Sequence, residues 1–483
     1  MPEHRTPGVY VEEAGATPPI IAPVETAMPV FVGYTAKVSA RGTGRTDRQA
    51  LRVDSLADYA RLFGQAPLHD MAVAVIKRVD AAGQVLDVSV AWAAFDPVPR
   101  HFLAHALQHY FENGGGTCFV YSLGRYRRPR KADFLAAIAA LEDVEGPTLL
   151  TMPDAALLDD GDHVEVLEAA LASCARRRDR FAIADVPRAL PGGTATAAAV
   201  ESNFRAALTG DNALRRYGAA YFPYVDTALP LRSSNGRTRL AVFDVVTVAP
   251  GGGETSAPHH EFVGSNLSRG LERKEPEVYG AVKAFVGQAR ATLPPSGAVT
   301  GLYARRDRER GVWEAPAGEP LTAVRQPAVA VSEALNGALN VDPAAGKSVN
   351  VIRHFTGRGT LVWGARTMAG NDNEWRYVNV SRFAIFLEQS LNRGLQWAVF
   401  EPNDANTWAR LRLAAETFLT GLWRQGALQG SKPEQAFTVA AGLGTTMTQD
   451  DIDNGRTIVQ IGFAPVRPAE FILLRILLRQ RAP

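Results

Sequence analysis

The chain has 483 residues, enough for two or three domains, and 46% of them are hydrophobic, so it can bury a substantial core. Its 52 Lys and Arg residues nearly balance 50 Asp and Glu residues, so the overall charge gives no reason to expect nucleic acid or an anionic membrane as a partner. The only two cysteines, Cys118 and Cys174, exclude a disulfide framework and a four-cysteine zinc site. The opening residues lack the apolar core of a signal peptide, and no window approaches the ~18 apolar residues of a membrane span, so we expect synthesis in the cytoplasm without membrane insertion.

The N-terminal stretch, residues 1–29, combines a short strand with a proline-rich linker. Residues 8–13, "GVYVEE", have strand composition, and the linker that follows contains Pro18, Pro19, Pro23 and Pro29. Dense prolines favour an extended backbone, so about 16 linker residues could span ~50 Å at ~3.1 Å each. The pattern therefore predicts a strand on a long tether.

Residues 30–225 alternate helical and strand patterns. The apolar run 30–36 predicts a core strand, and residues 55–64 predict a helix that begins at a Ser55 cap and ends at Gly64. Helix-then-strand segments follow at residues 99–124, 131–154 and 163–187. This alternation predicts an α/β layer with a largely parallel sheet.

Residues 226–293 have weaker patterns, and we interpret them as a variable insertion. Turn residues surround a possible hairpin, with a loop at residues 251–253.

Residues 294–464 form a predicted C-terminal domain. Strands are expected at residues 357–367, 374–383 and 456–466, and helices at residues 381–397 and 404–426. Apolar side chains share one face in each helix, and Asp404 is a plausible cap for the second.

The last residues, 465–483, mirror the N-terminus. From Phe471 to Leu478 only Arg475 is polar, and Pro465 and Pro468 separate this apolar ribbon from the preceding domain. Such a segment is either the last strand of the chain's own sheet or a strand that completes the sheet of another chain.

Motifs for metal or phosphate binding are incomplete. His101, His105 and His109 have helical spacing, but the apolar residues of that helix gather on the opposite side, so we interpret the histidines as a solvated face and predict no metal site. Gly346-Lys347-Ser348 matches the end of a phosphate-binding loop, yet Val341 stands where that loop needs glycine and a strand is expected to follow.

Basic runs at residues 125–131, 176–180 and 305–310 indicate charged surface, two of them interleaved with acids. No catalytic motif accompanies them, so we predict that the chain is not an enzyme and needs no cofactor. A nucleic-acid-binding protein, or an enzyme with an unrecognised site, is the alternative.

Several stretches in register identify a family resemblance. In chain order they are "TPGVYVEE", "FENGGGTCFV", "RFAIADVP", "AAYFPYV", "PPSGAVTGLYARRDRERGVWEAPAGE", "GRGTLVWGARTM", "EWRYVNVSRF", "WAVFEPND", "LWRQGALQG" and "APVRPAEFI". With these the chain resembles the sheath protein of contractile phage tails and related contractile injection systems. The resemblance covers most of the chain and is densest after Pro294.

The resemblance implies a multi-domain α/β (α+β) subunit, with a mixed sheet flanked by helices in the C-terminal domain and extended strand arms at both termini. The implied strands exchanged between subunits are Val9, Tyr10, Val11 and Glu12 at one end, and Phe471, Ile472, Leu473, Leu474, Arg475 and Ile476 at the other. The hinges would be Pro18, Pro19, Pro23, Pro465 and Pro468.

The implied partners are copies of the chain itself, in stacked hexameric rings that form a helical cylinder, together with an inner tube protein and baseplate and terminal cap proteins. Neither nucleic acid nor direct membrane insertion is expected. Assembly would take place in the bacterial cytoplasm, as part of a phage tail or phage-tail-like particle that contracts to drive the tube through a target envelope. On the helix at 404–426, Arg410, Arg412 or Arg424 could contact the tube, although these arginines could equally only solvate the helix.

Overall fold

The computed structural model describes residues 20–38, 49–187, 200 and 204–470. The chain divides into two compact units. Of the described residues, the small unit contains 20–24 and 386–466, and the large unit contains those within 25–385 and residues 467–470. Among the described residues, no helix is both long enough and apolar enough to cross a membrane.

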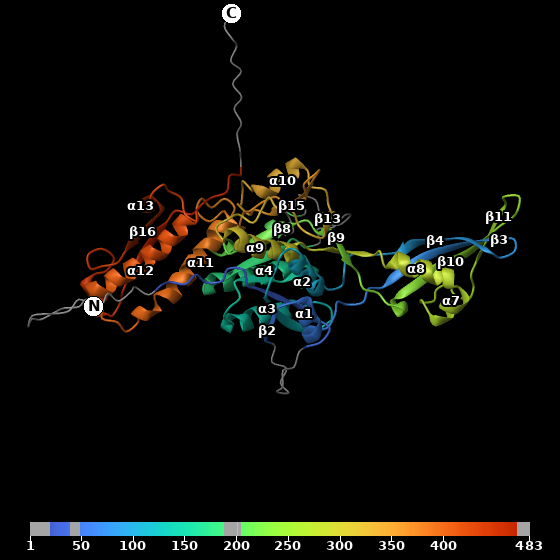
Figure 1. The fold of residues 1–483 in the computed structure, drawn as a ribbon, viewed down its shortest axis with the longest axis horizontal. Helices are drawn as coiled ribbons and strands as arrows, with labels where there is room; N and C mark the ends of the chain where they lie inside the picture. The colour runs from blue at the N-terminus through green and yellow to red at the C-terminus, as the bar shows by residue number, and fades with distance from the viewer. Residues whose placement is uncertain (1–19, 39–48, 188–199, 201–203, 471–483) are drawn as a thin grey trace, which may run out of the picture. The chain divides into compact units, whose positions relative to one another are not determined.

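The large unit is built on an eight-stranded mixed sheet (Figure 1). Its strands are β1 (Pro29–Thr35), β2 (Ala50–Val53), β5 (Cys118–Arg125), β6 (Leu149–Thr151), β7 (Phe181–Asp185), β8 (Gly218–Phe222), β14 (Asn350–Phe355) and β15 (Gly359–Val362). They lie in the order β15-β14-β8-β7-β6-β1-β5-β2. The six inner strands are parallel, and β2 and β15 are antiparallel edges, which confirms the predicted α/β layer.

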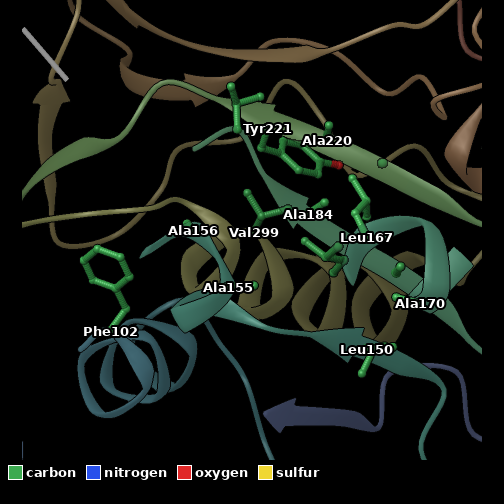
Figure 2. Close-up of a cluster of buried hydrophobic side chains, with 14 of the residues drawn as sticks. Phe102, Leu150, Ala155, Ala156, Leu167, Ala170, Ala184, Ala220, Tyr221 and Val299 are labelled. Atoms are coloured by element: carbon green, nitrogen blue, oxygen red, sulfur yellow. The ribbon is translucent and has the colours of Figure 1, made fainter. Parts of the chain in front are cut away.

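Helices cover both faces of this sheet. They are α1 (Leu56–Phe63), α2 (Leu103–Glu112), α3 (Lys131–Ala140), α4 (Asp160–Arg177) and α9 (Ser296–Arg310). Because side chains alternate along a strand, Phe31 of β1 packs with α1 and α2, whereas Val30 and Val32 pack with the residues of α3 and α4. Figure 2 shows part of the core, in which buried side chains of the strands and of α4 and α9 meet. The predicted Ser55 cap is confirmed, because its hydroxyl accepts a hydrogen bond from the Asp58 amide.

Helices α2 and α9 pack against each other through glycine. A Cβ atom placed on Gly301 would lie 2.5 Å from the carbonyl oxygen of Tyr110, and one placed on Gly297 would lie 2.5 Å from that of Ala106. Only glycine permits this approach, so α2 is enclosed by α9 as well as by the sheet.

A separate four-stranded sheet in the order β11-β10-β3-β4 has helices α7 and α8 beside it (Figure 1). Its elements are β3 (Met71–Asp80), β4 (Val85–Ala94), β10 (Thr238–Val248), β11 (Glu254–Pro258), α7 (Arg269–Lys274) and α8 (Pro276–Val286). The hairpin expected within residues 226–293 is β10 and β11. However, β10 also pairs along its length with β3, so this segment shares a sheet with residues 71–94, which no sequence pattern had singled out.

Shorter elements complete the large unit. They are α6 (Asn212–Arg215), β9 (Val225–Pro230), β12 (Arg290–Leu293), β13 (Val324–Pro327) and α10 (Glu333–Asn340), with β9 central in a three-stranded sheet.

The small unit contains the end of α11 (Val378–Gly394), then α12 (Ala405–Arg424), α13 (Pro433–Ala436), β16 (Phe437–Ala440), α14 (Gln449–Asp453) and β17 (Gln460–Phe463). The Asp404 cap of α12 is confirmed, because its carboxylate accepts from the Thr407 amide. The strand predicted at residues 374–383 is wrong, because the chain enters α11 at Val378. The valines at 378 and 380 alternate as in a strand, but Val380, Phe383 and Leu387 share the buried face of the helix.

Candidate assembly site

The place in the eight-stranded sheet where sheets of this type bind ligands is occupied by the side chain of Asp154. In open α/β sheets, ligands bind at the carboxyl ends of strands where the chain reverses direction across the sheet. Here that point lies between the neighbouring strands β1 and β6, because the strand beyond β1 is β5, whereas the strands beyond β6, in the opposite direction, are β7 and β8. Fully buried Asp154, just after β6, accepts hydrogen bonds there from the amides of Tyr34 (2.7 Å), Phe102 (2.5 Å) and Leu103 (3.2 Å).

These contacts place a carboxylate at the N-terminus of α2, where other proteins of this architecture hold an anionic ligand. Desolvation raises the pKa of Asp154. A Cβ atom on Gly33 would lie only 2.7 Å from a carboxylate oxygen of Asp154, so the Asp154 side chain packs tightly against β1. The crevice therefore serves internal packing.

The histidines of α2 are buried, so the predicted solvated face is wrong. His101, His105 and His109 are 6%, 2% and 0% exposed. The sequence pattern failed because other segments of the chain cover the histidine side of α2: His109 lies 3.2 Å from the carbonyl oxygen of Thr322, and His101 stacks on Tyr126. Burial lowers the pKa of His105 and of His109 to about 4. Within the described residues, no group of three His, Cys, Asp or Glu side chains is arranged to hold a metal ion.

The glycine-lysine-serine sequence at 346–348 is part of a structural turn. A strand, β14, follows it, as expected. Lys347 donates to the carbonyl oxygen of Arg205 at 2.6 Å, and Ser348 donates to that of Asn340 at 2.6 Å. These contacts engage the lysine and serine side chains within the unit.

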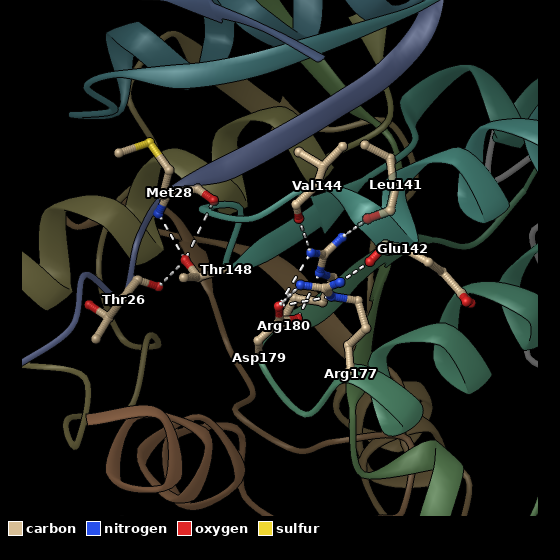
Figure 3. Close-up of polar contacts among 9 residues, drawn as sticks. All are labelled: Thr26, Met28, Leu141, Glu142, Val144, Thr148, Arg177, Asp179 and Arg180. Atoms are coloured by element: carbon tan, nitrogen blue, oxygen red, sulfur yellow. Dashed lines mark hydrogen bonds and ion pairs between the residues drawn. The ribbon is translucent and has the colours of Figure 1, made fainter. Parts of the chain in front are cut away.

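The basic runs are partly structural. Arg180 is 1% exposed and donates to the carbonyl oxygens of Leu141 (3.0 Å) and Val144 (2.8 Å), as Figure 3 shows. In the run at residues 305–310, Arg305 and Arg306 both form ion pairs with Glu319.

Glu470, next to the predicted C-terminal exchange strand, is held in a buried ion pair. Arg366 binds both carboxylate oxygens of Glu470, at 2.9 and 2.5 Å, and donates to the carbonyl oxygen of Gly370. The two side chains are 5% and 14% exposed. Asn350 in turn holds the backbone of Arg366 by accepting from its amide and donating to its carbonyl oxygen. The last described residue before the predicted exchange strand is therefore fixed in place.

The N-terminal linker is anchored in the large unit by Thr148. Its hydroxyl donates to the carbonyl oxygen of Thr26 at 2.8 Å and accepts from the amide of Met28 at 2.9 Å (Figure 3). Arg382 also donates to the Thr26 carbonyl oxygen, and Arg382 is itself held in a buried ion pair with Asp307.

The linker is also anchored in the small unit. Ile21 is 4% exposed and packs against Gly394, where a Cβ atom would lie 2.6 Å from the isoleucine side chain. The Val24 amide donates to the hydroxyl of Ser390 at 3.1 Å. Pro23 lies between these two contacts, so its segment is docked on its own chain. A long free tether would have to begin earlier.

The two-stranded sheet of the small unit has open edges. Phe437 faces Phe463 and Val439 faces Ile461, and these four side chains on one face are half-buried. In the described part of the chain, β16 and β17 pair only with each other. A sheet of two short strands is marginal alone and gains stability from further strands.

The backbone geometry shows which groups face these edges. The Ala464 amide donates to the carbonyl oxygen of Ala436 at 2.8 Å. In an antiparallel pair, ladder bonds alternate along the strand, so the N–H groups of Val439 and Ile461 point away from the partner strand. Each edge therefore presents backbone groups that an added strand could bind.

Comparisons with known proteins bear on this arrangement. Residues 370–479 match the family described as the phage tail sheath C-terminal domain. A chain of the anti-feeding prophage baseplate, solved by cryo-EM, is 29% identical with a TM-score of 0.63, covering 99% of this chain and 100% of that one. A chain of the sheath complex of the extracellular contractile injection system PVC, in its contracted state, is 28% identical with a TM-score of 0.63, covering 99% and 98%.

The chain therefore shares the fold of these two proteins over nearly its whole length, and residues 370–479 are similar to the phage tail sheath C-terminal domain family. The tail sheath protein of Vibrio phage KVP40 is 24% identical over 188 residues, which are 38% of this chain and 26% of that protein. This chain thus aligns with about a quarter of the length of that relative.

The structure places the three predicted tube-contacting arginines in different surroundings. Arg410 lies 4.3 Å from the Trp397 ring and pairs with Glu401, and Arg412 donates to the carbonyl oxygen of Ala441. Arg424, in the last turn of α12, is exposed.

The predicted exchange strands, at residues 9–12 and 471–476, lie outside the described residues, as do Pro18 and Pro19. Pro465 is described, and it forms a bridge with Leu428 of the small unit. Sequence patterns missed the anchors Arg366, Glu470 and Thr148, because an ion pair between residues 104 positions apart leaves no local signal.

Proposed function

We propose that the chain is the structural subunit of a contractile sheath, which assembles with copies of itself, by strand exchange, into the wall of a helical cylinder around an inner tube. The observation that carries the proposal is the two-stranded sheet of the small unit, whose two edges present outward backbone groups. The donors are the predicted strands at residues 9–12 and 471–476, which would bind these edges on neighbouring subunits.

Rough magnitudes support a cooperative mesh. Six residues forming about five ladder hydrogen bonds contribute about 5 kcal/mol, and ~300 Å² of apolar burial adds about 7 kcal/mol. Ordering six residues costs ~1–2 kcal/mol each. One donated strand is therefore marginal, and many reciprocal links are needed for a stable wall. Donor and acceptor surfaces differ, and such heterologous contacts build open helices.

The anchors suggest how contraction would be transmitted. If the strand links persist while the bodies move, tension along an arm reaches the body where the arm is fixed. The anchors at Thr26 and Glu470 supply those points in the large unit. Contraction from a metastable extended lattice would then need no nucleotide. Flexing would fall to Pro18, Pro19 and Pro468 more than to the docked Pro23 and the bridged Pro465.

A sheath subunit would also contact an inner tube, a baseplate and a cap protein. The face of α12 that carries exposed Leu413 and Arg424 is our candidate for contact with the inner tube. Stacked hexameric rings, a baseplate at one end and a cap protein at the other would complete the particle, which would be assembled in the bacterial cytoplasm.

A pair of truncations tests the donated C-terminal strand. Ending the chain after Glu470 should leave a folded subunit that forms no cylinders in negative-stain microscopy, with tube and baseplate proteins co-expressed as a control for assembly. Ending it after Ala469 should in addition lower the melting temperature, because Arg366 loses its buried partner. Normal cylinders from the first truncation would refute strand donation by this arm.

Proline substitutions test the acceptor edges. Val439→Pro and Ile461→Pro each remove one outward N–H group and spare the ladder between β16 and β17. We expect folded subunits with at least ~10-fold less assembled sheath. Val439→Thr, which keeps the N–H group, is the matched control and should assemble. Equal assembly of the proline and threonine variants would rule out these edges as acceptors.

A further inference from the structure

The large unit carries a basic pocket that neither the arms nor the open sheet uses. The pocket has a volume of about 820 Å³ and opens to the surface. Segments from several parts of the chain line it, and they contribute Arg100, Arg127, Arg128, Arg232 and Arg237.

Two carboxylates partly neutralise these arginines. Asp70 binds Arg100 at 2.6 Å and Arg237 at 2.8 Å, and Asp133 binds Arg127 at 2.7 Å.

The positive charge exceeds what these carboxylates balance. Among the described residues, Arg128 and Arg232 form no ion pair, and Arg232 donates only to the carbonyl oxygen of Ala66. Gathering guanidinium groups in one concave site costs free energy unless an anion offsets their repulsion.

The walls of the pocket are well defined. Tyr126 stacks on His101 with ring centroids 4.9 Å apart and donates to the carbonyl oxygen of Gln65. Burial lowers the pKa of His101, so at neutral pH the imidazole is uncharged and adds a polar wall without further repulsion. The stacked rings and this hydrogen bond hold one wall of the pocket in place.

We propose that this pocket binds a compact polyphosphate, either inorganic or the phosphate chain of a nucleoside triphosphate. Guanidinium forks match phosphate oxygens in pairs, and a ligand with three or four negative charges would balance the excess. Bound there, it would link the segment at residues 126–129 to the segment at residues 232–237.

An acidic protein segment is the competing ligand. Two exposed acidic segments of the chain already have basic partners: Glu142 pairs with Arg176, and Asp451 pairs with Arg456. This favours a small anion over an acidic surface of a second copy.

The test uses the purified full-length chain, titrated calorimetrically with sodium tripolyphosphate and with ATP at an ionic strength held constant with NaCl. We expect saturable binding and a rise in melting temperature of about 3 °C at saturating ligand. Arg128→Gln and Arg232→Gln should each weaken binding at least ~10-fold. Arg273→Gln, which removes an exposed charge from α7, is the matched control and should bind normally.

Similar affinities for both ligands would assign the phosphate chain as the recognised group, and a clear preference for ATP would assign a nucleotide; either supports the proposal. Absence of saturable binding, or equal weakening by the control, would overturn it. So would tighter binding of a peptide with the sequence of residues 447–456, because the pocket would then recognise an acidic protein segment.

Discussion

The eight-stranded sheet of the large unit and the two-stranded sheet of the small unit differ in how far other parts of the chain cover and pair their strands. In the first, inner strands such as β1 are fully buried between helices, and the ligand crevice is closed by Asp154. In the second, the strands are half-exposed and each has one described partner. The difference teaches that one part of this chain is complete in itself, whereas another offers backbone groups to further strands.

The largest expected difference is in acid stability: low pH should destabilise the large unit more than the small unit. His105 and His109 have folded-state pKa values of about 4, against an ordinary value of 6.5. The neutral form is therefore favoured in the folded state, and stability is lost as the pH falls from about 6.5 towards 4, by about 3 kcal/mol for each histidine. The small unit has no histidine in residues 386–466. Hydrogen exchange at pH 7 and pH 4.5 should show opening of α2 and its neighbours before that of α12.

A variant isolates the histidine effect. Burial raises the pKa of Asp185 to about 7, so this carboxyl has the opposite effect. The stability that its protonated form contributes to the folded protein is lost as the pH rises through 7. The measured quantity is therefore the difference between the wild-type chain and the His105→Leu, His109→Gln double variant. Identical pH dependence of the two would contradict the histidine assignment.

Glycine substitutions should have opposite signs in the two units. Gly301→Ala forces α2 and α9 apart and should lower the free energy of unfolding by about 3 kcal/mol. Gly421 in α12 has open space at its Cβ position, so Gly421→Ala should stabilise the small unit by about 1 kcal/mol. Urea denaturation of both variants measures these changes. A neutral Gly301→Ala would mean that the helices can move apart without cost.

The anchor of the C-terminal arm should matter more than a surface ion pair. Arg366→Met leaves Glu470 buried without its partner, at a cost of about 2–3 kcal/mol. Arg410→Met removes a half-exposed pair with Glu401 and should change stability by less than about 1 kcal/mol. Thermal unfolding of the two variants makes the comparison, and equal effects would argue against a buried anchor.

Lengthening the linker should have the smallest effect on stability. Inserting a few Gly and Ser residues next to Pro18 lies before the docked Ile21, so the melting temperature should stay unchanged. Assembled particles should fail to contract, because longer links let the bodies separate without tension. Electron microscopy after a contraction trigger reads the outcome, and normal contraction would count against the tether.

Local patterns predicted much of the fold. The strand β1, the helix after Ser55 and the helix after Asp404 were all found from composition and caps. The strand predicted across Val378 failed, because alternating valines fit a strand and a buried helix face equally well over five residues. The exposed face predicted for α2 failed, because it is buried by segments far away along the chain, such as Thr322, which lies 213 positions from its contact His109.

By itself the sequence determined the alternation of helices and strands, the apolar ribbon between Phe471 and Leu478 and the family resemblance, because these depend on neighbouring residues and their order. Only the tertiary structure decided that Asp154 closes the crevice and that Glu470 and Thr148 fix the chain beside the predicted arms. It also decided that β16 and β17 pair only with each other among the described strands, and that five arginines meet in one pocket. Each of these depends on contacts between residues far apart in the chain, which folding brings together and which no local pattern records.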